Sequence, residues 1–312
     1  MKKRNYLFIV NPEAGSGHAQ QVWPQLRHWL NEQQLLYSVH FTHYPHHEYQ
    51  LAQELAHYLT STTILVVVGG DGTLHETLNG LHHADVQATI GYIPCGSGND
   101  FARGANIPAD PLAALQKITT ATDPTTLDIG VFYEKTRNIT AVFTNNLGIG
   151  FDARVVHQTN QAPSKKFLNK VRLGISSYVL SAINAFFRQR AFQLTATIDG
   201  KTQTYERAFL VTTTNHPYFG GGVPIMPLAK MNDGKLDLVI IEKKSTLKFI
   251  WLFITMLLPG HRYLSFRNFH HFQANQIDLS TTSAEFGQAD GEVLNSDPFN
   301  ISFTLSKQQF LI

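Results

Sequence analysis

The sequence predicts two domains: an N-terminal α/β domain on a parallel sheet and a C-terminal, mostly antiparallel β-sandwich domain. Up to Ile118, short apolar runs alternate with segments of helical periodicity, which is typical of βα units. From Thr126 onward, apolar–polar alternation and hairpin turns dominate. Three glycine-rich loops follow strands of the first domain, where ligands bind in open α/β sheets.

Composition narrows the class of protein. The chain has 312 residues with a formal net charge of +2, a balance that argues against a nucleic-acid partner. Its single cysteine cannot form an internal disulfide, which favours a reducing cytoplasm. The longest apolar run of the C-terminal half, Phe249–Leu258, is too short to span a bilayer. We therefore expect a cytoplasmic protein that meets a membrane only peripherally.

The N-terminal domain is expected over residues 1–124 as a nucleotide-binding domain. Expected strands cover residues 6–10, 36–42, 64–68 and 89–93, and expected helices cover 18–34, 48–59, 101–104 and 111–118. A further helix is expected after the glycine-rich stretch Gly69–Gly72, the central loop of the three, because Leu74, Leu78 and Leu81 have helical spacing. Thr73 with Glu76 is a capping-box pattern, so this helix is predicted to begin at Thr73.

The C-terminal domain is expected over residues 125–312, and its last strand could return to the first domain. Expected strands cover residues 127–132, 138–145, 192–198, 205–214, 236–241, 269–279 and 299–305, with inserted helices at 171–187 and 247–258. Phe249–Leu258 is expected to be a buried helix, with a membrane wedge as the alternative. Lys165, Lys166, Lys170 and Arg172 are interpreted as a solvated face, with contact to anionic lipid as the alternative.

The stretch Gly69–Glu76 is the centre of the candidate site. Glycines let the backbone approach a ligand closely, and free N–H groups at a helix start favour phosphate. Asp71 places one carboxylate inside this loop. Taken alone, the loop is equally compatible with a tight strand-to-helix turn. Together with Asn11–Gly17 and Gly96–Asn99, it predicts a polar cradle for a triphosphate and its metal. The motifs of P-loop nucleotidases and NAD dehydrogenases are absent from the sequence.

Two stretches of the second domain carry carboxylates beside glycine. Asp233-Gly234 is interpreted either as a plain turn or as part of a divalent-ion site with oxygen ligands. Asp290-Gly291-Glu292 is interpreted, without further context, as a solvated hairpin tip.

The order of these motifs resembles the diacylglycerol kinase catalytic-domain family, which includes bacterial soluble lipid kinases and is related to sphingosine and ceramide kinases. The resemblance rests on six stretches: Asn11–Gly17, Gly69–Thr73, Pro94–Ala102, Asn146–Ala153, Gly220–Asp237 and Asp290–Glu292. It departs at His75, where relatives often have Asn, and at Cys95, where they commonly have an aliphatic residue. Ser97 stands where the family usually has Thr, and it keeps the hydroxyl group.

The resemblance implies roles for individual residues. Glu292 would be the general base, and Asp71 would hold the metal-bound phosphates. Asp233, with the backbone carbonyls of Lys230 and Lys235, would hold a structural Mg²⁺. ATP would be bound by Asn11, Pro12, Glu13, Ala14, Gly15, Thr42, Gly69, Gly70, Asp71, Gly72, Thr73, Leu74, His75 and Ser97, of which Thr42 is carried over on position alone.

The implied function is an ATP-dependent lipid kinase that phosphorylates a neutral lipid at the membrane surface, with diacylglycerol converted to phosphatidic acid. An NAD kinase-like activity is the second reading, because those enzymes share the Gly-Gly-Asp-Gly loop. A non-catalytic lipid-binding regulatory protein is the third. The sequence does not choose among diacylglycerol, phosphatidylglycerol, sphingoid bases and polyprenols. Base rates of assembly favour a homodimer.

Overall fold

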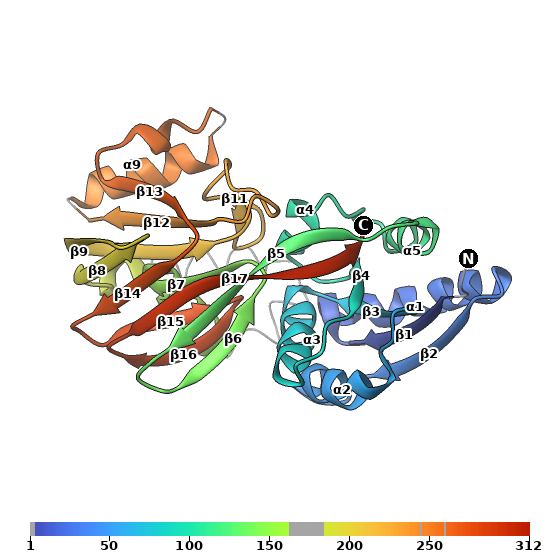
Figure 1. Ribbon diagram of the computed structural model, residues 1–312. Helices are drawn as coiled ribbons and strands as arrows, with labels where there is room; N and C mark the ends of the chain where they lie inside the picture. The colour runs from blue at the N-terminus through green and yellow to red at the C-terminus, as the bar shows by residue number, and fades with distance from the viewer. Residues whose placement is uncertain (1–3, 162–183, 244, 259) are drawn as a thin grey trace. The chain divides into compact units, whose positions relative to one another are not determined.

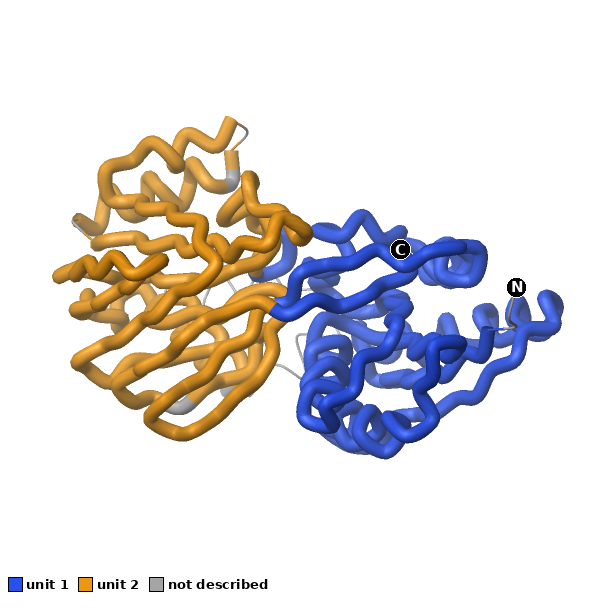
Figure 2. The backbone as a smooth tube through the Cα atoms, viewed as in Figure 1, with its two compact units in different colours: residues 1–129, 220–222, 306–312 blue, residues 130–219, 223–305 orange. Residues whose placement is uncertain are grey.

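The computed structural model describes residues 4–161, 184–243, 245–258 and 260–312 (Figure 1). The chain divides into two units (Figure 2): residues 1–129, 220–222 and 306–312 form unit 1, and residues 130–219 and 223–305 form unit 2. Most of the helix predicted at 171–187 lies outside the described residues, and residues 184–188 are helical. Lys165, Lys166, Lys170 and Arg172 also lie outside the described residues.

Unit 1 is an α/β domain with a parallel sheet, as predicted. Its strands are β1 (Asn5–Val10), β2 (Leu36–Phe41), β3 (Thr63–Gly69) and β4 (Thr89–Pro94). They pair in the order β2-β1-β3-β4, and the end of β17 (Asn300–Leu311) pairs with β4 in the same direction. Every residue of β3 is buried, because helices cover both faces of such a sheet.

The helices of unit 1 lie between these strands. They are α1 (Ala14–Glu32), α2 (His47–Leu55), the 3₁₀ helix η1 (Ala56–Tyr58), α3 (Asp71–His83), α4 (Asp100–Gly104) and α5 (Pro111–Thr120). α2 packs on α3, and α1 packs on α5. The connections through α1 and α2 run in opposite directions along the sheet, so the right-handed crossover rule places these two helices on opposite faces. Residues 15–17 of α1 have left-handed φ angles, so regular helical geometry begins at His18, as the sequence predicts.

Unit 2 is a mostly antiparallel β-sandwich, again as predicted. Its strands are β5 (Thr125–Glu134), β6 (Ile139–Phe143), β7 (Asn146–Gly150), β8 (Phe192–Ile198), β9 (Lys201–Thr214), β10 (Tyr218–Phe219), β11 (Val223–Pro224), β12 (Leu236–Glu242), β13 (Phe269–Ala274), β14 (Ile277–Thr281), β15 (Glu285–Ala289), β16 (Glu292–Asp297) and β17. Its helices are α6 (Phe151–Gln161), α9 (Thr246–Leu257) and the 3₁₀ helix η3 (Arg262–Ser265). β5 begins and β17 ends in unit 1, so both strands belong to both units.

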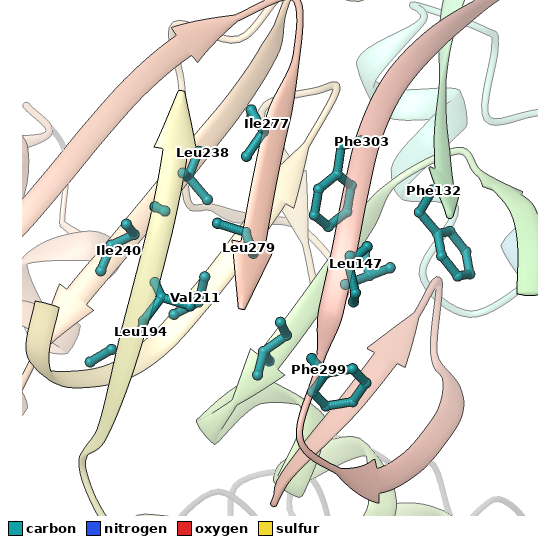
Figure 3. Close-up of a cluster of buried hydrophobic side chains, with 14 of the residues drawn as sticks. Phe132, Leu147, Leu194, Val211, Leu238, Ile240, Ile277, Leu279, Phe299 and Phe303 are labelled. Atoms are coloured by element: carbon teal, nitrogen blue, oxygen red, sulfur yellow. The ribbon is translucent and has the colours of Figure 1, made fainter. Parts of the chain in front are cut away.

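Two hydrophobic clusters stabilise unit 2. The first joins residues of several strands, including Leu194, Leu238 and Phe303 (Figure 3). The second joins strand residues to α6 and α9 through Phe151, Phe209 and Phe249. β12 serves both clusters, because its successive side chains point to opposite faces and both faces are covered.

Two strand predictions were wrong for the same physical reason. The predicted strand 269–279 is interrupted because the Asp199 carboxylate accepts hydrogen bonds from the N–H groups of Asn275 and Gln276, at 3.3 and 3.2 Å. The predicted strand 138–145 ends at Phe143, because the Asp290 carboxylate binds the next three N–H groups. In each case a carboxylate distant in sequence takes donors that a longer strand could have used.

Candidate functional site

Three glycine-containing loops of unit 1 touch one another at the carboxyl ends of β1, β3 and β4. A methyl group on Gly96 would lie 2.5 Å from the Cα of Gly70, and one on Gly70 would lie 3.1 Å from the Cα of Gly96. A methyl group on Gly15 would overlap the carbonyl oxygen of Cys95. Backbone therefore meets backbone at these positions, and side chains larger than hydrogen are excluded at Gly15 and Gly96.

Asn11 joins the first loop to the central one. Its Nδ2 donates to Glu48 Oε1 at 2.7 Å and to Thr73 Oγ1 at 3.1 Å. Its Oδ1 accepts from the N–H of Glu13 at 3.0 Å, which shapes the loop after β1. The Asn11 side chain is thus used on both its donor and acceptor sides.

The predicted capping box at Thr73 was wrong. α3 begins at Asp71 with Gly70 as its N-cap, and glycine has no side chain that could cap the helix. The Thr73 side chain instead packs against Gly69 and accepts from Asn11. The first turn of the helix therefore starts inside the glycine loop, and the space beside the Cα of Gly72 is open. Uncapped N–H groups and open space are what a phosphate needs at a helix start.

The Asp71 carboxylate accepts hydrogen bonds from the start of α4. Its Oδ2 accepts from the N–H of Asp100, and its Oδ1 accepts from the N–H of Phe101, both at 3.1 Å. The carboxylate thus caps the start of α4 from the loop after β3. This contact fixes the loop after β4 relative to the central loop.

Asp100 is a site residue that the sequence reasoning did not select. It is buried, its Oδ1 lies 2.5 Å from Arg103 Nη1, and its Oδ2 accepts from the N–H of Gly221 at 2.7 Å. Gly221 belongs to the short segment 220–222 of unit 1. The motif Pro94–Ala102 contained Asp100, but nothing in the sequence indicated its contact with a residue so distant along the chain.

The remaining predicted nucleotide residues differ in exposure. Thr42 is buried directly after β2, and its N–H donates to Val10 O at 2.9 Å. Leu74 and His75 are buried in α3, whereas Ser97 is exposed. Leu74 packs into the domain, so its side chain is not available to a ligand.

Glu48 is a second residue that sequence reasoning missed. It is buried at the start of α2, and burial, reinforced by nearby Glu76, raises the pKa of its carboxyl. Its Oε1 accepts from Asn11, so it fixes the amide orientation in the loop after β1. No local pattern marks a carboxylate as the partner of an asparagine in another element.

Glu292 is the first residue of β16 and is exposed. The hairpin turn before it consists of Asp290 and Gly291, with φ angles of 49° and 91°. Asp290 is a structural residue: its carboxylate accepts from the N–H and hydroxyl of Thr144 and from the N–H groups of Asn145 and Asn146, at 2.6–3.0 Å. The solvated-tip interpretation holds for Glu292 and was wrong for Asp290.

Asp152 and Gln288 form a second support for the same turn. Gln288 Oε1 accepts from the N–H of Gly291 at 2.8 Å, and its Nε2 donates to Asp152 Oδ2 at 3.3 Å. Asp152 Oδ1 is buried and has no hydrogen-bond partner among the residues that the structure describes. Burial raises the pKa of Asp152 from 3.8 to about 7, so its carboxyl is partly protonated at neutral pH.

The predicted metal residues form an exposed turn in unit 2. Asp233 Oδ1 accepts from the N–H of Lys235 at 3.1 Å, and Gly234 between them has a φ of 73°. Lys230, Asp233 and Lys235 are all exposed. The described residues contain no group of three His, Cys, Asp or Glu side chains that could hold a metal ion. A carboxylate, carbonyls and water are nevertheless the oxygen donors that Mg²⁺ prefers.

The structure thus brings together the predicted residues of the loops after β1, β3 and β4 within unit 1. Glu292 and the turn at 230–235 belong to unit 2. Among the described residues, no helix is long and apolar enough to cross a bilayer.

Comparison with known proteins follows the division of the chain. Residues 5–132 match the family model of the diacylglycerol kinase catalytic domain. Residues 145–307 match the model described as the YegS C-terminal NAD kinase beta sandwich-like domain.

Individual proteins match over most of the chain. A Bacillus subtilis (strain 168) protein named "Putative lipid kinase YtlR" is 30% identical over 302 residues, which are 96% of each chain. A diacylglycerol kinase of the same organism is 32% identical over 232 residues, 73% of this chain and 71% of that protein. A solved structure of a "putative diacylglycerol kinase" from Bacillus anthracis str. Sterne has a TM-score of 0.77 at 25% identity, covering 99% of this chain and 95% of the other.

Proposed function

The chain belongs to the diacylglycerol kinase catalytic-domain family of lipid kinases, and from this membership we propose that it transfers the γ-phosphoryl group of ATP to a hydroxyl of a neutral lipid. Diacylglycerol is the proposed acceptor, and phosphatidic acid is the product. The observation that carries the nucleotide half of the proposal is the backbone contact among three glycine loops at one sheet edge.

The nucleotide would be held mainly by the backbone of the loops after β1, β3 and β4. The open space beside Gly72, at the uncapped start of α3, suits a phosphate group. Asn11 and Thr73 border this start with polar side chains, and exposed Ser97 adds a hydroxyl from the third loop. Phosphoryl transfer depends chiefly on positioning and charge neutralisation, which such a cradle supplies.

Glu292 is proposed as the general base. In the transfer, the bond between the γ-phosphorus and the β,γ-bridging oxygen breaks, and a bond forms between that phosphorus and the lipid oxygen. ADP leaves with the bridging oxygen, and the hydroxyl proton passes to the Glu292 carboxylate. A positioned base contributes typically about 10²–10⁴-fold to such a rate. The turn before Glu292 is held through Asp290 and Gln288, which gives the base a defined position.

Mg²⁺ is the proposed cofactor in two roles. Asp71 would bind the metal associated with the phosphates, and Asp233 with the carbonyls of Lys230 and Lys235 would hold a structural ion. The donor chemistry fits, because Asp233 is exposed and carboxylate and carbonyl oxygens are hard ligands. When bound at the phosphates, the ion would neutralise negative charge.

The decisive experiment is a lipid panel with γ-labelled ATP. Purified protein would be offered diacylglycerol, phosphatidylglycerol, a sphingoid base and a polyprenol in mixed micelles. Label transfer to diacylglycerol above the others is the expected result. Transfer to a different lipid would overturn the proposed acceptor while leaving the lipid kinase activity intact.

NAD is a second candidate acceptor, favoured by one observation. The family model that matches residues 145–307 describes an NAD kinase-like β-sandwich. Including NAD in the panel tests this directly, because label would then appear in a water-soluble product. If neither NAD nor any lipid is labelled, a non-catalytic lipid-binding role is the reading that survives.

A further inference from the structure

Helix α9 of unit 2 has two apolar faces, of which only one is covered. Phe249, Leu252 and Met256 are buried against the second hydrophobic cluster. The other face exposes large apolar side chains at helical spacing: Leu247 (81% exposed), Ile250 (43%), Trp251 (57%), Ile254 (44%) and Leu258 (51%) just beyond the helix. The prediction of a buried helix is therefore correct for one face only.

Such a surface is unusual for a helix that meets water. A helix on a protein surface normally directs polar side chains outward. Scattered apolar side chains on a surface need no explanation, but a continuous stripe marks a site that binds something. The outward stripe of α9 includes a tryptophan, a residue enriched where proteins meet the interface of a bilayer.

The segment that carries this stripe has charges of one sign. From Lys243 to Ile277 the sequence contains five Lys and Arg residues and no Asp or Glu. Lys248 on α9, Arg262 on η3 and Arg267 are exposed. The preceding carboxylate, Glu242, lies 2.9 Å from His270 Nε2 and is not part of the stripe. A surface of this charge is complementary to an anionic partner.

A hollow lies beside the stripe and contains two of these cations. Its volume is about 730 Å³, and it is lined by Leu247, Lys248, Trp251, Ser265, Phe266, Arg267 and Asn268. Apolar walls with two basic side chains suit an anionic head group whose acyl chains continue along the apolar stripe. A hydrophobic protein partner would not require this concentration of positive charge.

We propose that the exposed face of α9, with Lys248 and Arg267, docks the protein onto the surface of an anionic lipid bilayer. The inference rests on the proposed function in one respect: a lipid acceptor is the reason for the enzyme to meet a membrane. Its evidence is the surface of unit 2 alone. The stripe inserts at the level of the acyl boundary, while the basic side chains contact head groups.

The test is vesicle co-sedimentation without ATP. Wild-type protein should sediment with phosphatidylcholine vesicles containing phosphatidylglycerol and bind pure phosphatidylcholine vesicles far less. Trp251→Ala should weaken binding to the anionic vesicles about tenfold, because it removes a large apolar side chain from the buried surface. The double variant Lys248→Glu with Arg267→Glu should weaken binding about 20-fold or more, and added salt should reduce wild-type binding in the same direction.

Two matched controls test whether binding depends on this surface or on any exposed aromatic or basic side chain. Tyr58 in unit 1 is an aromatic side chain that is 68% exposed, and Lys201 in unit 2 is an exposed cation. Tyr58→Ala and Lys201→Glu should bind vesicles like wild type. Thermal melts should show unchanged stability for the α9 variants, because every substituted side chain is exposed.

Three outcomes would overturn the proposal. The proposal is refuted if both α9 variants bind anionic vesicles as tightly as the wild-type protein does. It is also refuted if the wild-type protein binds neutral and anionic vesicles equally. If Trp251→Ala instead converts a dimer into a monomer in sedimentation velocity, the stripe is a contact between two copies. The micelle panel tests the kinase function separately. If the protein binds vesicles but phosphorylates nothing in the panel, the kinase function is refuted and the docking surface is supported.

Discussion

At the scale of single residues, the glycines of the cradle serve two different purposes. Gly96 has no room for a methyl group, because the Cα of Gly70 would lie 2.5 Å away. A methyl group added to Gly72 would meet nothing within 4 Å, and the φ angle of Gly72 is not in the left-handed region. Packing therefore requires glycine at the first position, whereas a ligand is the proposed reason for glycine at the second.

Alanine at these two positions should separate the two purposes. Gly96→Ala is expected to lower the free energy of unfolding by about 1–3 kcal/mol, as overpacking does, and to abolish turnover. Gly72→Ala should leave stability unchanged or slightly higher and still weaken ATP binding at least tenfold. Urea melts and ATP titrations measure the two effects. Normal ATP affinity in Gly72→Ala would place the phosphates elsewhere.

Asp152 should make stability depend on pH. Its pKa is raised from 3.8 to about 7 by burial, so the folded chain binds a proton more tightly than the unfolded chain. Its contribution to the free energy of unfolding is therefore fully present below about pH 4 and is lost as pH rises to about 7. The loss is at most about 4 kcal/mol, since each pKa unit corresponds to about 1.4 kcal/mol.

Asp152→Asn tests this assignment, because an amide cannot ionise in this range. The slope of the unfolding free energy between about pH 4 and pH 7 should become flatter in Asp152→Asn than in wild type. Chemical denaturation across that range measures the slope. An identical slope in both proteins would assign the pH dependence to other groups.

At the scale of elements, the turn between β15 and β16 separates a structural carboxylate, Asp290, from the proposed general base, Glu292. Asp290 accepts hydrogen bonds from three consecutive backbone N–H groups of residues 144–146, whereas Glu292 is exposed. Two carboxylates only two residues apart therefore lie in different environments.

We expect Glu292→Gln to lower kcat about 10²-fold or more while the melting temperature stays unchanged. Asp290→Asn should lower both, with a loss of stability of about 1–3 kcal/mol, because an amide cannot accept all these hydrogen bonds. Kinetics paired with thermal melts on each variant give the comparison. Wild-type turnover by Glu292→Gln would refute its assignment as the base.

The elements that the sequence predicted best are those specified by local pattern. β3 is a continuous apolar run that is buried on both faces, and the glycine loops follow their strands as expected. β15 and β16 were missed because their short sequences, such as Glu285–Ala289, lack a clear alternation of apolar and polar residues. The start of α3 was misplaced because Thr73 found a partner in another loop.

In the candidate site, as in the fold, the features set by local sequence could be predicted. Glycine loops and motif carboxylates such as Asp71 are visible along the chain, so they could be selected from sequence. Glu48, Asp100 and Gln288 act through hydrogen bonds to residues outside their own elements, and no local spacing encodes such contacts. At Phe249–Leu258 the sequence favoured a buried helix over a membrane wedge, because an apolar run alone does not reveal which faces of a helix are covered.

At the scale of the whole molecule, the last residues of the chain complete the first sheet. Gln309, Phe310 and Leu311 pair with β4 in parallel, and Phe310 is fully buried. The ring centroid of Phe310 lies 5.0 Å from that of Phe101, the residue whose N–H is bound by Asp71. The C-terminus therefore supports the loop region proposed to bind the nucleotide.

Phe310→Ala should lower the free energy of unfolding by about 3–5 kcal/mol, because it leaves a cavity where the ring was. It should also weaken ATP binding, because this cavity adjoins α4. Ile312→Ala is the matched control, since Ile312 lies beyond β17 and is only partly buried. Denaturation curves and ATP titrations measure both effects. Equal stability of the two variants would show that the end of β17 contributes little to unit 1.

This arrangement has a consequence for synthesis on the ribosome. β1 to β4 emerge before unit 2, yet the strand that covers the outer side of β4 is translated only after β5 to β16. The nascent sheet must wait with one flank unpaired while the entire β-sandwich is made. A chain halted before residue 306 would therefore lack part of this sheet, even though every residue of β1 to β4 had been translated.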